Sequence, residues 1–479
     1  MKKIAILIAL VVTGLAIYIY APPVNLDEMM TVEEMETDYD VLRSALQEGL
    51  PTLYLYTPKD EMDTYFDKQR KSLSEPMTRL AFCRKIKETV ASANDAHTQA
   101  MPGRGASSWF SKQKCRLPLK LRILDGRAYV ERDYGIGEAY LGAEILKLNG
   151  KPMSDIVQKM LAFISTDGAN STGAYALMGE TTDFALMYRM LYGPVTSFTI
   201  QFRKLDGLEE DVTTNGISGS ELSTAYRNRY ADSRPEPIRL EWRGDTPVLF
   251  FGNFGQPEVN GIPVAQFISE TFEEIERRKC QNLIIDLTNN GGGDMEMPEL
   301  LASYLLDQPF QLSASVTMKK KDFQFYKNCV MTPPNKFFKD MIQQPDGTWS
   351  NPSFSRKVKP MTPVFKGKIF VITAGINHSS TTLFVNALHR VNRAVFIGEE
   401  VMGSYHSFSG GMGGLLRLKN SDMMVMIPTL KLRLPPAPHP YKDRGVQPHH
   451  TVLPAMDDLV SGKHTGVEFA LDLIGNGTR

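Results

Sequence analysis

The sequence predicts an α/β protein of several domains, an α+β multidomain chain whose C-terminal core is built on a mainly parallel sheet. Charged amphipathic helix patterns dominate the N-terminal part, and short strand patterns with tight turns follow. From about residue 238, near-continuous apolar strands alternate with amphipathic helices, which is typical of a parallel sheet covered on both faces. The length of 479 residues agrees with roughly three domains.

The N-terminus carries an export pattern. Lys2 and Lys3 precede an uncharged apolar run over residues 4–21, which is close to the minimum length for a membrane span. No small-x-small cleavage site stands before Pro22. We therefore expect residues 1–24 to be a signal anchor rather than a cleaved signal peptide, with cleavage left open. The body is expected on the periplasmic or extracellular side, anchored to the membrane by this segment.

Composition excludes several kinds of partner. Lys+Arg and Asp+Glu both number 54, so the formal net charge is zero, and a nucleic-acid partner is not expected. None of the four cysteines forms a C-x-x-C pair, which argues against a Cys-rich metal site. The sequence leaves open whether they are thiols or disulfides. His449 and His450 have no third ligand nearby, so no metal or other cofactor is predicted.

The chain divides into three regions after the anchor. Residues 28–113 are expected to be mainly helical, and their last helix ends at a turn-like "NDAH". Residues 114–210 form the β-rich module, where a strand, an Asn149-Gly150 turn and an amphipathic helix follow one another. Residues 235–475 form the α/β core.

The core is predicted from alternating patterns. We expect strands at "PVLFF", "NLIID", "KIFVIT" and "RAVFIG" and helices at "VAQFISETFEEIERRK", "PELLASYLL" and after residue 380. The stretch 318–360 is polar and contains Pro and aromatic residues. We interpret it as an insertion or a long loop.

Two polar turns follow buried strands of this core. The first, "INHSSTT", places Ser379 where a strand passes into a helix. Ser and Thr at that place are favoured N-caps, and a nucleophile is the alternative if a base and N–H donors are in reach. The second turn is "LTNNGGGD", and its three glycines allow unusual backbone angles or expose N–H groups to an anion. An ordinary turn stays open for it; a phosphate loop is excluded because no G-K-[ST] follows.

Four segments, in order, resemble the serine peptidase family of tail-specific (C-terminal-processing) peptidases and the tricorn core. "DLTNNGGG" is similar to the D-L-R-x-N-x-G-G turn, and "FVITAGINHSSTTLFVNALHRVNRAVFIGEEVMG" to the strand, nucleophile, helix and G-E-x-x-G segment. "RGVQPH" resembles G-[VI]-x-P-D, and "YLGAEILKLNGKPMSDI" resembles the PDZ-like module of the family. The resemblance covers residues 75–455. It implies a crotonase-like core of the ClpP type and, for 114–210, a PDZ-like module that captures an extended chain or a free C-terminus by strand addition.

The resemblance places the nucleophile on Ser379. The N–H groups of Ser380 and of Gly292, in the glycine turn, would then form the oxyanion hole. One branch of the family uses a Ser–Lys dyad, but Ser404 stands where that Lys is expected. The tricorn-like branch uses a His in a D-x-H-T motif, which "NDAHTQ" matches, so the implied base is His97.

The remaining assignments concern an orienting acid and a second histidine. Asp443 in "YKDRGV" is the nearest carboxylate to the pattern that supplies an acid to orient His97. His378 precedes the nucleophile and is interpreted as substrate-lining or incidental. Departures from the family pattern at Thr288, Thr382, His449 and Ala96 mark a divergent member.

The sequence therefore predicts an exported serine-type endopeptidase that cleaves unfolded proteins or peptides and needs no cofactor. Two alternatives stay open: a catalytically degenerate peptide- or ligand-binding protein of the same fold, and a serine esterase. An α/β-hydrolase proper is disfavoured because no G-x-S-x-G elbow occurs. Oligomeric state, cleavage preference and substrate identity are not fixed by the sequence.

Overall fold

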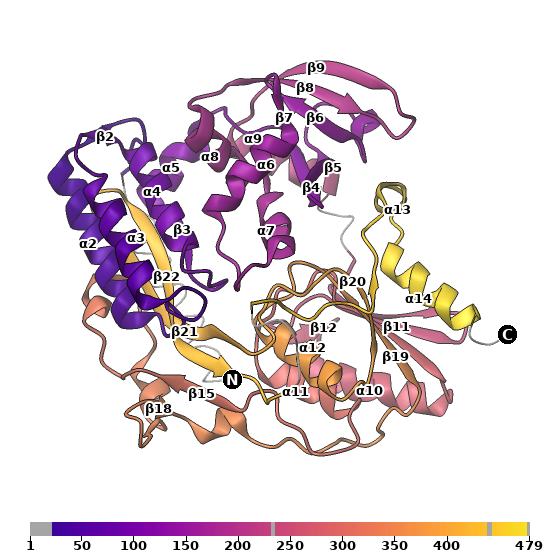
Figure 1. Cartoon of the computed structure of the whole chain (residues 1–479). Helices are drawn as coiled ribbons and strands as arrows, with labels where there is room; N and C mark the ends of the chain where they lie inside the picture. The colour runs from indigo at the N-terminus through magenta and orange to yellow at the C-terminus, as the bar shows by residue number, and fades with distance from the viewer. Residues whose placement is uncertain (1–21, 231–234, 438–442, 477–479) are drawn as a thin grey trace.

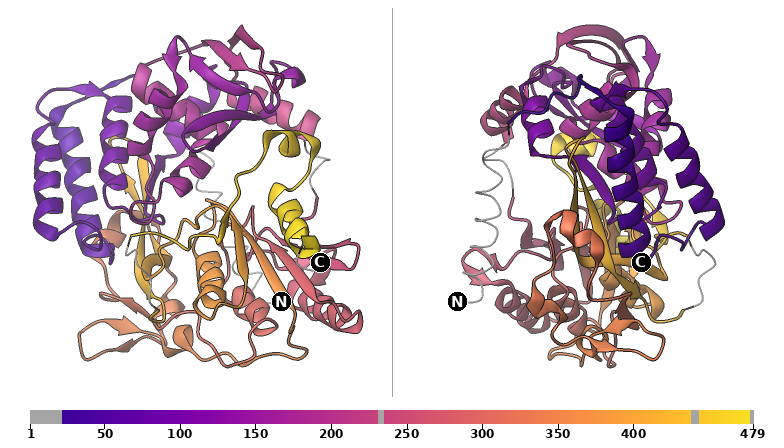
Figure 2. Two further views of the ribbon diagram at one scale, coloured as in Figure 1. Left: turned by 45° about the vertical axis from the view of Figure 1, so that its right-hand side comes forward. Right: turned by 90° about the vertical axis from the view of Figure 1, so that its left-hand side faces the viewer.

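A computed structural model describes residues 22–230, 235–437 and 443–476. Figure 1, and Figure 2 from two further sides, show the N-terminal helices beside a long β-hairpin, the β-rich module at the top of the molecule, and the α/β core below the module. The predicted anchor at 1–24 lies almost wholly outside the described residues. Within the described ranges, no helix is both long and apolar enough to cross a bilayer.

The core sheet has six strands in the order β10-β11-β14-β19-β20-β23. Only β10 and β11 are antiparallel, and every other neighbouring pair is parallel. The predicted mainly parallel sheet is thus confirmed. Its strands are β10 (Ile238–Arg243), β11 (Thr246–Phe251), β14 (Asn282–Asp286), β19 (Lys368–Thr373), β20 (Val395–Gly398) and β23 (His450–Thr451).

Alternating side chains of β11 show how both faces are covered. Val248 and Phe250 pack with residues of α14 (Thr465–Asn476) on one face. Leu249 and Phe251 belong to the large core on the other face, which includes α10, α11 and α12. Because side chains alternate along a strand, a fully apolar strand such as β11 requires cover on both sides. The helices are α10 (Val264–Arg277), α11 (Glu296–Ser303) and α12 (Ser380–Arg390).

A second, antiparallel sheet differs from the sequence prediction. Its centre is a long hairpin that the strand–helix pattern did not predict, because glycines interrupt the alternation and the register shifts between Gly410 and Gly413. The predicted loop at 318–360 contributes short strands and 3₁₀ turns to this sheet instead of being a plain loop. The strands are β21 (Ser407–Leu418), β22 (Met423–Arg433), β15 (Ser315–Met318), β16 (Cys329–Met331), β17 (Ile342–Gln343) and β18 (Trp349–Ser350).

The N-terminal helices share the hydrophobic core of this hairpin. α2 (Val32–Gly49) begins at a capping box of Thr31 and Glu34, and α4 (Arg79–Ala91) begins at the N-cap Thr78. After α4 the chain forms β3 (Gln99–Pro102), which pairs with β22. Because of this pairing, the "NDAH" turn, which precedes β3, lies beside the C-terminal hairpin.

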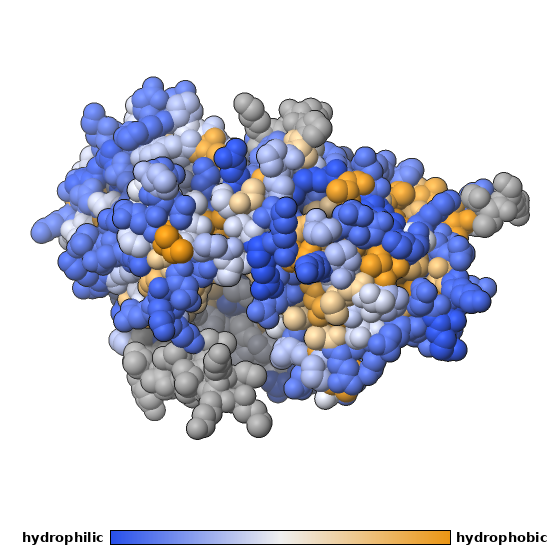
Figure 3. Space-filling model, turned by 90° about the horizontal axis from the view of Figure 1, so that it is seen from below, coloured by the Kyte–Doolittle hydropathy of each residue, from blue (hydrophilic) through white to orange (hydrophobic). Residues whose placement is uncertain are grey.

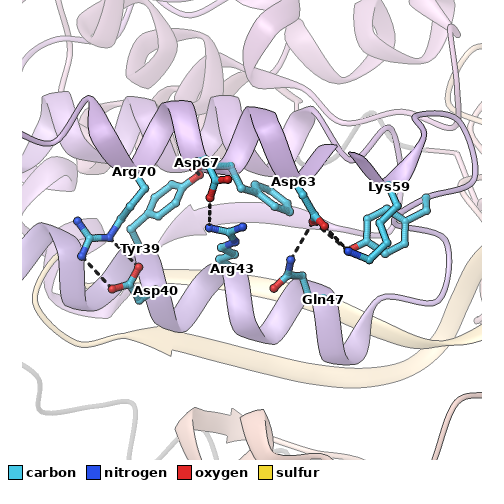
Figure 4. A network of polar contacts seen from close by, with 10 residues as sticks. Tyr39, Asp40, Arg43, Gln47, Lys59, Asp63, Asp67 and Arg70 are labelled. Carbon is cyan, nitrogen blue, oxygen red and sulfur yellow. Dashed lines mark hydrogen bonds and ion pairs between the residues drawn. The ribbon is translucent and has the colours of Figure 1, made fainter. Parts of the chain in front are cut away.

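Polar contacts join α2 to α3 (Lys59–Lys71), as Figure 4 shows. Arg43 donates to Asp67 at 2.7 Å, Gln47 donates to Asp63 at 2.9 Å, and Arg70 donates to Asp40 at 2.7 Å. These pairs are partly exposed, so each contributes only about 0.2–1 kcal/mol. The buried apolar side of α2 therefore contributes most to holding the helices on the hairpin.

The β-rich module has a separate hydrophobic core and a sheet in the order β4-β5-β6-β8-β9. The predicted strand, Asn149-Gly150 turn and helix are present as β6, the turn and α6. One edge of the sheet, β4, is covered: Leu121 N–H donates to Gly179 C=O at 3.2 Å, and the Thr181 hydroxyl donates to Leu119 C=O at 3.0 Å. The bounds are β4 (Leu119–Leu124), β5 (Arg127–Asp133), β6 (Glu144–Leu148), α6 (Met153–Met160), α7 (Ser171–Met178), α8 (Thr181–Tyr192), β8 (Ser197–Arg203) and β9 (Glu209–Asn215).

All four cysteines are free thiols, and Cys83 and Cys115 are buried. On the face drawn in Figure 3, hydrophilic residues predominate and apolar residues form several separate patches. Large exposed apolar side chains are scattered over different elements, among them Met29, Leu208 and Ile342. Scattered exposure of this kind is normal for a folded protein and identifies no docking surface.

Candidate active site

Ser379 lies in an unusual backbone conformation at the head of α12. Its φ of 59° and ψ of −129° fall outside the regions that L-residues ordinarily occupy. Its side chain makes no capping hydrogen bond to the helix. The hydroxyl is therefore not an N-cap. A strained strand-to-helix turn that presents an unused serine hydroxyl is the arrangement of a nucleophile.

Two fully buried asparagines hold this turn, and the first is Asn377. Its Nδ2 donates to the C=O of Leu287 at 2.7 Å and to the C=O of Asn290 at 2.8 Å. Its Oδ1 accepts from the N–H of Ala374 at 2.7 Å. The turn after β19 is thereby fixed to the glycine turn after β14.

Asn290 completes the connection. Its Oδ1 accepts from the Thr381 hydroxyl at 2.7 Å and from the N–H of Gly292 at 2.9 Å, and its Nδ2 donates to the C=O of Phe251 at 2.7 Å. The ends of β11, β14 and β19 are joined through these bonds. The sequence reasoning missed both asparagines, although an Asn shortly after each of two buried parallel strands is a readable signal.

The glycine turn lies against Ser379. Gly292 and Gly293 have φ values of 116° and 145°, which glycine adopts most readily. A Cβ on Gly292 would lie 2.8 Å from the Cβ of Ser379, so no larger residue fits without movement. The glycine turn is therefore in direct contact with Ser379.

The two predicted oxyanion donors differ in their surroundings. Ser380 is the first residue of α12, where N–H groups lack an acceptor within the helix. The N–H of Gly292 is bonded to Asn290, while Gly293 lines the cavity beside Ser379. The assignment of Gly292 stays a prediction.

His97 reaches this region through the pairing of β3 with β22. Its ring lies 4.6 Å, centroid to centroid, from that of His378 and stacks on Phe408 at 5.9 Å. Neither ring nitrogen of His97 has a hydrogen-bond partner, so no hydrogen bond joins it to Ser379. The predicted base is thus beside the residue that precedes the nucleophile, with both nitrogens unused.

Burial controls the charge of both histidines. It lowers the pKa of His97 to about 4. Burial and, to a smaller degree, the neighbouring His97 lower the pKa of His378 to about 3. Both rings are neutral at pH 7, which is the form in which a histidine accepts a proton. His378, interpreted from the sequence as incidental or substrate-lining, is in contact with the candidate base.

Asp443 makes no hydrogen bond to His97, because neither ring nitrogen of His97 has a partner. Its backbone C=O accepts from the N–H of Ala169 at 3.0 Å. The role of Asp443 as orienting acid stays a prediction. Its neighbour Arg444 pairs with Glu400, which joins the "RGVQPH" segment to the "GEEVMG" segment.

A partly enclosed apolar cavity of about 170 Å³ lies beside Ser379. Its walls come from the core, the hairpin and the 318–360 region, and the only polar side chains among them are Ser379 and Ser380. The main apolar walls are Val316, Phe337, Leu383, Phe408, Met412 and Leu430. A cavity of this kind accepts an apolar side chain and offers nothing to a charged one.

A metal site is not built here. Within the described ranges, no group of three or more His, Cys, Asp and Glu side chains is placed to hold a metal ion. His449 instead accepts the N–H of Phe396 at 2.9 Å through its Nδ1.

Residues 253–452 match the model of peptidase family S41, so the chain carries an S41 peptidase domain, and the family resemblance drawn from the sequence motifs is confirmed. No curated protein sequence matches the chain.

Two solved structures have a similar fold. A mutant form of CPAF has 15% identity and a TM-score of 0.63 and covers 92% of this chain and 96% of its own. Mature CPAF complexed with lactacystin has 15% identity and a TM-score of 0.60, with coverage of 92% and 97%. At this identity the likeness shows the fold alone.

The two buried histidines predict a pH-dependent stability. Because their pKa values are lowered in the folded state, the stability they contribute is full above about pH 6.5 and is lost as the pH falls toward 4. The loss is at most about 1.4 kcal/mol per pH unit for each histidine. Urea unfolding between pH 7 and pH 4.5 measures it.

His97→Phe or His378→Phe is expected to flatten this decline, while His450→Gln, a change at a partly exposed histidine, leaves it as in the wild type. Equal slopes in all variants would show that these rings do not control the acid response.

Proposed function

We propose that the chain is an exported serine endopeptidase that cleaves unfolded proteins or peptides. Ser379 attacks the scissile carbonyl, and His97 takes its proton and returns it to the leaving amine. The N–H of Ser380 holds the oxyanion, and the N–H of Gly292 joins it by leaving Asn290 Oδ1 for the substrate; each such donor is worth about 3 kcal/mol of barrier. The observation that carries this proposal is the strained Ser379, whose hydroxyl caps nothing and lines an apolar cavity.

His97 must approach Ser379 for this reaction. Its nitrogens have no competing partner to release, and catalytic hydrogen bonds often form only in the substrate complex. The orienting acid in this proposal is Asp443. The proposed location is the periplasmic or extracellular side, with residues 1–24 as the anchor.

Substrate capture by the β-rich module is proposed at one edge only. Strand addition at β4 would have to displace the bonds from Gly179 and Thr181. β9 forms the opposite edge and is mostly exposed, and within the described part of the chain it pairs only with β8. An extended chain would therefore add beside β9.

The nucleophile and base are tested on casein with the full-length chain in detergent. Ser379→Ala and His97→Ala are each expected to lower kcat by about 10⁴-fold or more, because they act as one unit. Ser303→Ala and His450→Ala are matched controls: the Ser303 hydroxyl only bonds the C=O of Leu300, and His450 lies at β23. Both controls should retain wild-type rates.

Other outcomes decide between the alternatives. A wild-type chain that binds peptides without cleaving them would be a binding protein of this fold. Turnover of small acyl esters without peptide turnover would make it an esterase.

The cavity predicts the cleavage preference. Peptides with Leu, Met or Phe before the scissile bond should be cleaved faster than those with Gly or Asp, because burying such a side chain contributes about 1.5–3 kcal/mol. Val316→Phe, which fills the cavity, should lower kcat/KM by about 10-fold or more for the Leu peptide. The Ala peptide is the control and should change little; an equal loss for both would show that the cavity does not select the substrate.

A further inference from the structure

The segment Ser165–Asn170, here called the strap, is polar yet buried. It belongs to the β-rich module, where it connects the turn after α6 to α7, and it lies between the "NDAH" turn and the core. The side chains of Ser165, Asp167 and Asn170 belong to residues that are each only 1% exposed. A buried polar segment is stable only where its polar groups are hydrogen-bonded. The hydrogen-bond partners of the strap therefore show which parts of the molecule it joins.

On one side the strap holds the turn that carries His97. The Ser165 hydroxyl donates to the C=O of Asp95 at 2.7 Å and accepts from the N–H of the same residue at 3.1 Å. Asp167 Oδ1 accepts from the N–H of Ala96 at 2.9 Å, and the N–H of Gly168 donates to the C=O of Asn94 at 3.1 Å. Three successive residues before His97 are therefore fixed by the strap.

On the other side the strap holds the core. Asp167 Oδ2 accepts from the N–H of Ser404 at 3.1 Å, and Asn170 Nδ2 donates to the C=O of Val401 at 2.9 Å. Asp167 thus bonds one backbone N–H in each half of the site. Ser404, where a catalytic Lys was considered, contributes its backbone to this link.

α7 follows the strap directly and contacts the turn of Ser379. A Cβ on Gly375 would lie 2.5 Å from the C=O oxygen of Thr172, which is in the first turn of α7. Gly375 belongs to the same turn as Asn377 and Ser379. The strap and the start of α7 therefore contact both the turn of the base and the turn of the nucleophile.

We propose that the strap, with Asp167 at its centre, is a positioning element that sets His97 relative to Ser379. The imidazole of His97 makes no hydrogen bond, so its place depends on the backbone before it and on ring packing. Asp167 is a positioning residue, because it acts through Ala96 and Ser404 and touches no reacting atom. The catalytic consequence rests on the proposed function, while the holding of the turn does not.

The two bonds of Asp167 make a graded pair of variants available. Burial and the neighbouring Asp95 raise the pKa of Asp167, and Asp95 itself accepts from the hydroxyls of Thr98 at 2.9 Å and Ser409 at 2.6 Å. An Asn side chain has one acceptor oxygen, so Asp167→Asn can accept from the N–H of Ala96 or of Ser404 but not from both, whereas Asp167→Ala accepts from neither.

The test compares Asp167→Ala and Asp167→Asn with Asp38→Ala in the full-length chain. Asp38 is a buried carboxylate that accepts from the N–H and the hydroxyl of Ser421, both at 2.7 Å, away from the site. Asp167→Ala should lower kcat on casein by about 30-fold with KM changed less than about 3-fold, because displaced groups lose rate rather than binding. Hydrogen exchange of residues 94–98 should become about 10-fold faster or more.

Asp167→Asn, which keeps one of the two bonds, should lower kcat less than Asp167→Ala does and should speed the exchange of residues 94–98 less. Asp38→Ala should lower Tm by a similar amount while kcat and the exchange of residues 94–98 stay as in the wild type. If Asp167→Ala fails to fold, the kcat and the exchange of Asp167→Asn decide.

Unchanged kcat and unchanged hydrogen exchange in the Asp167 variants would overturn the proposed positioning role of the strap, even if the wild type is a peptidase. Faster exchange confined to residues 94–98 in a chain without peptidase activity would support the holding role and would defeat the proposed function alone.

Discussion

The site depends on two amides, Asn290 and Asn377, that are completely buried where three parallel strands end. Ser379 adopts a backbone conformation that costs of order 1–3 kcal/mol, and such a conformation persists only where the surroundings fix it. The asparagines supply that fixation, because their bonds reach Phe251, Leu287 and Ala374 in three separate segments. A buried amide left unbonded is costly, so these bonds form together or not at all.

The site also requires that His97, from the N-terminal region, lie close to the turn of Ser379. β3 pairs with β22, and the helices before it pack on the same hairpin, so the N-terminal region is part of the core that surrounds the site. The β-rich module has a core of its own and touches the site through the strap and α7. Any change in how the module sits would therefore act on the turns of His97 and Ser379 together.

Features that depend on local sequence patterns were predictable, whereas features that depend on contacts between distant residues were not. The parallel strands β11, β14 and β19 were predictable because their apolar runs are local patterns, and the place of Ser379 between a strand and a helix was predictable for the same reason. The hairpin β21–β22 was not, because Gly410, Gly411, Gly413 and Gly414 break the alternation that marks a strand. The strap was missed because its bonds join residues far apart in the chain. For the same reason no pattern decides which carboxylate orients His97.

The central claim is that Ser379 is an activated nucleophile, and covalent labelling tests it most directly. The full-length chain is treated with a fluorophosphonate probe, and the modified peptide is identified by mass spectrometry. The account predicts one adduct, on Ser379, formed at a much lower rate in His97→Ala. An adduct on another serine, or no adduct on a folded chain, would contradict it.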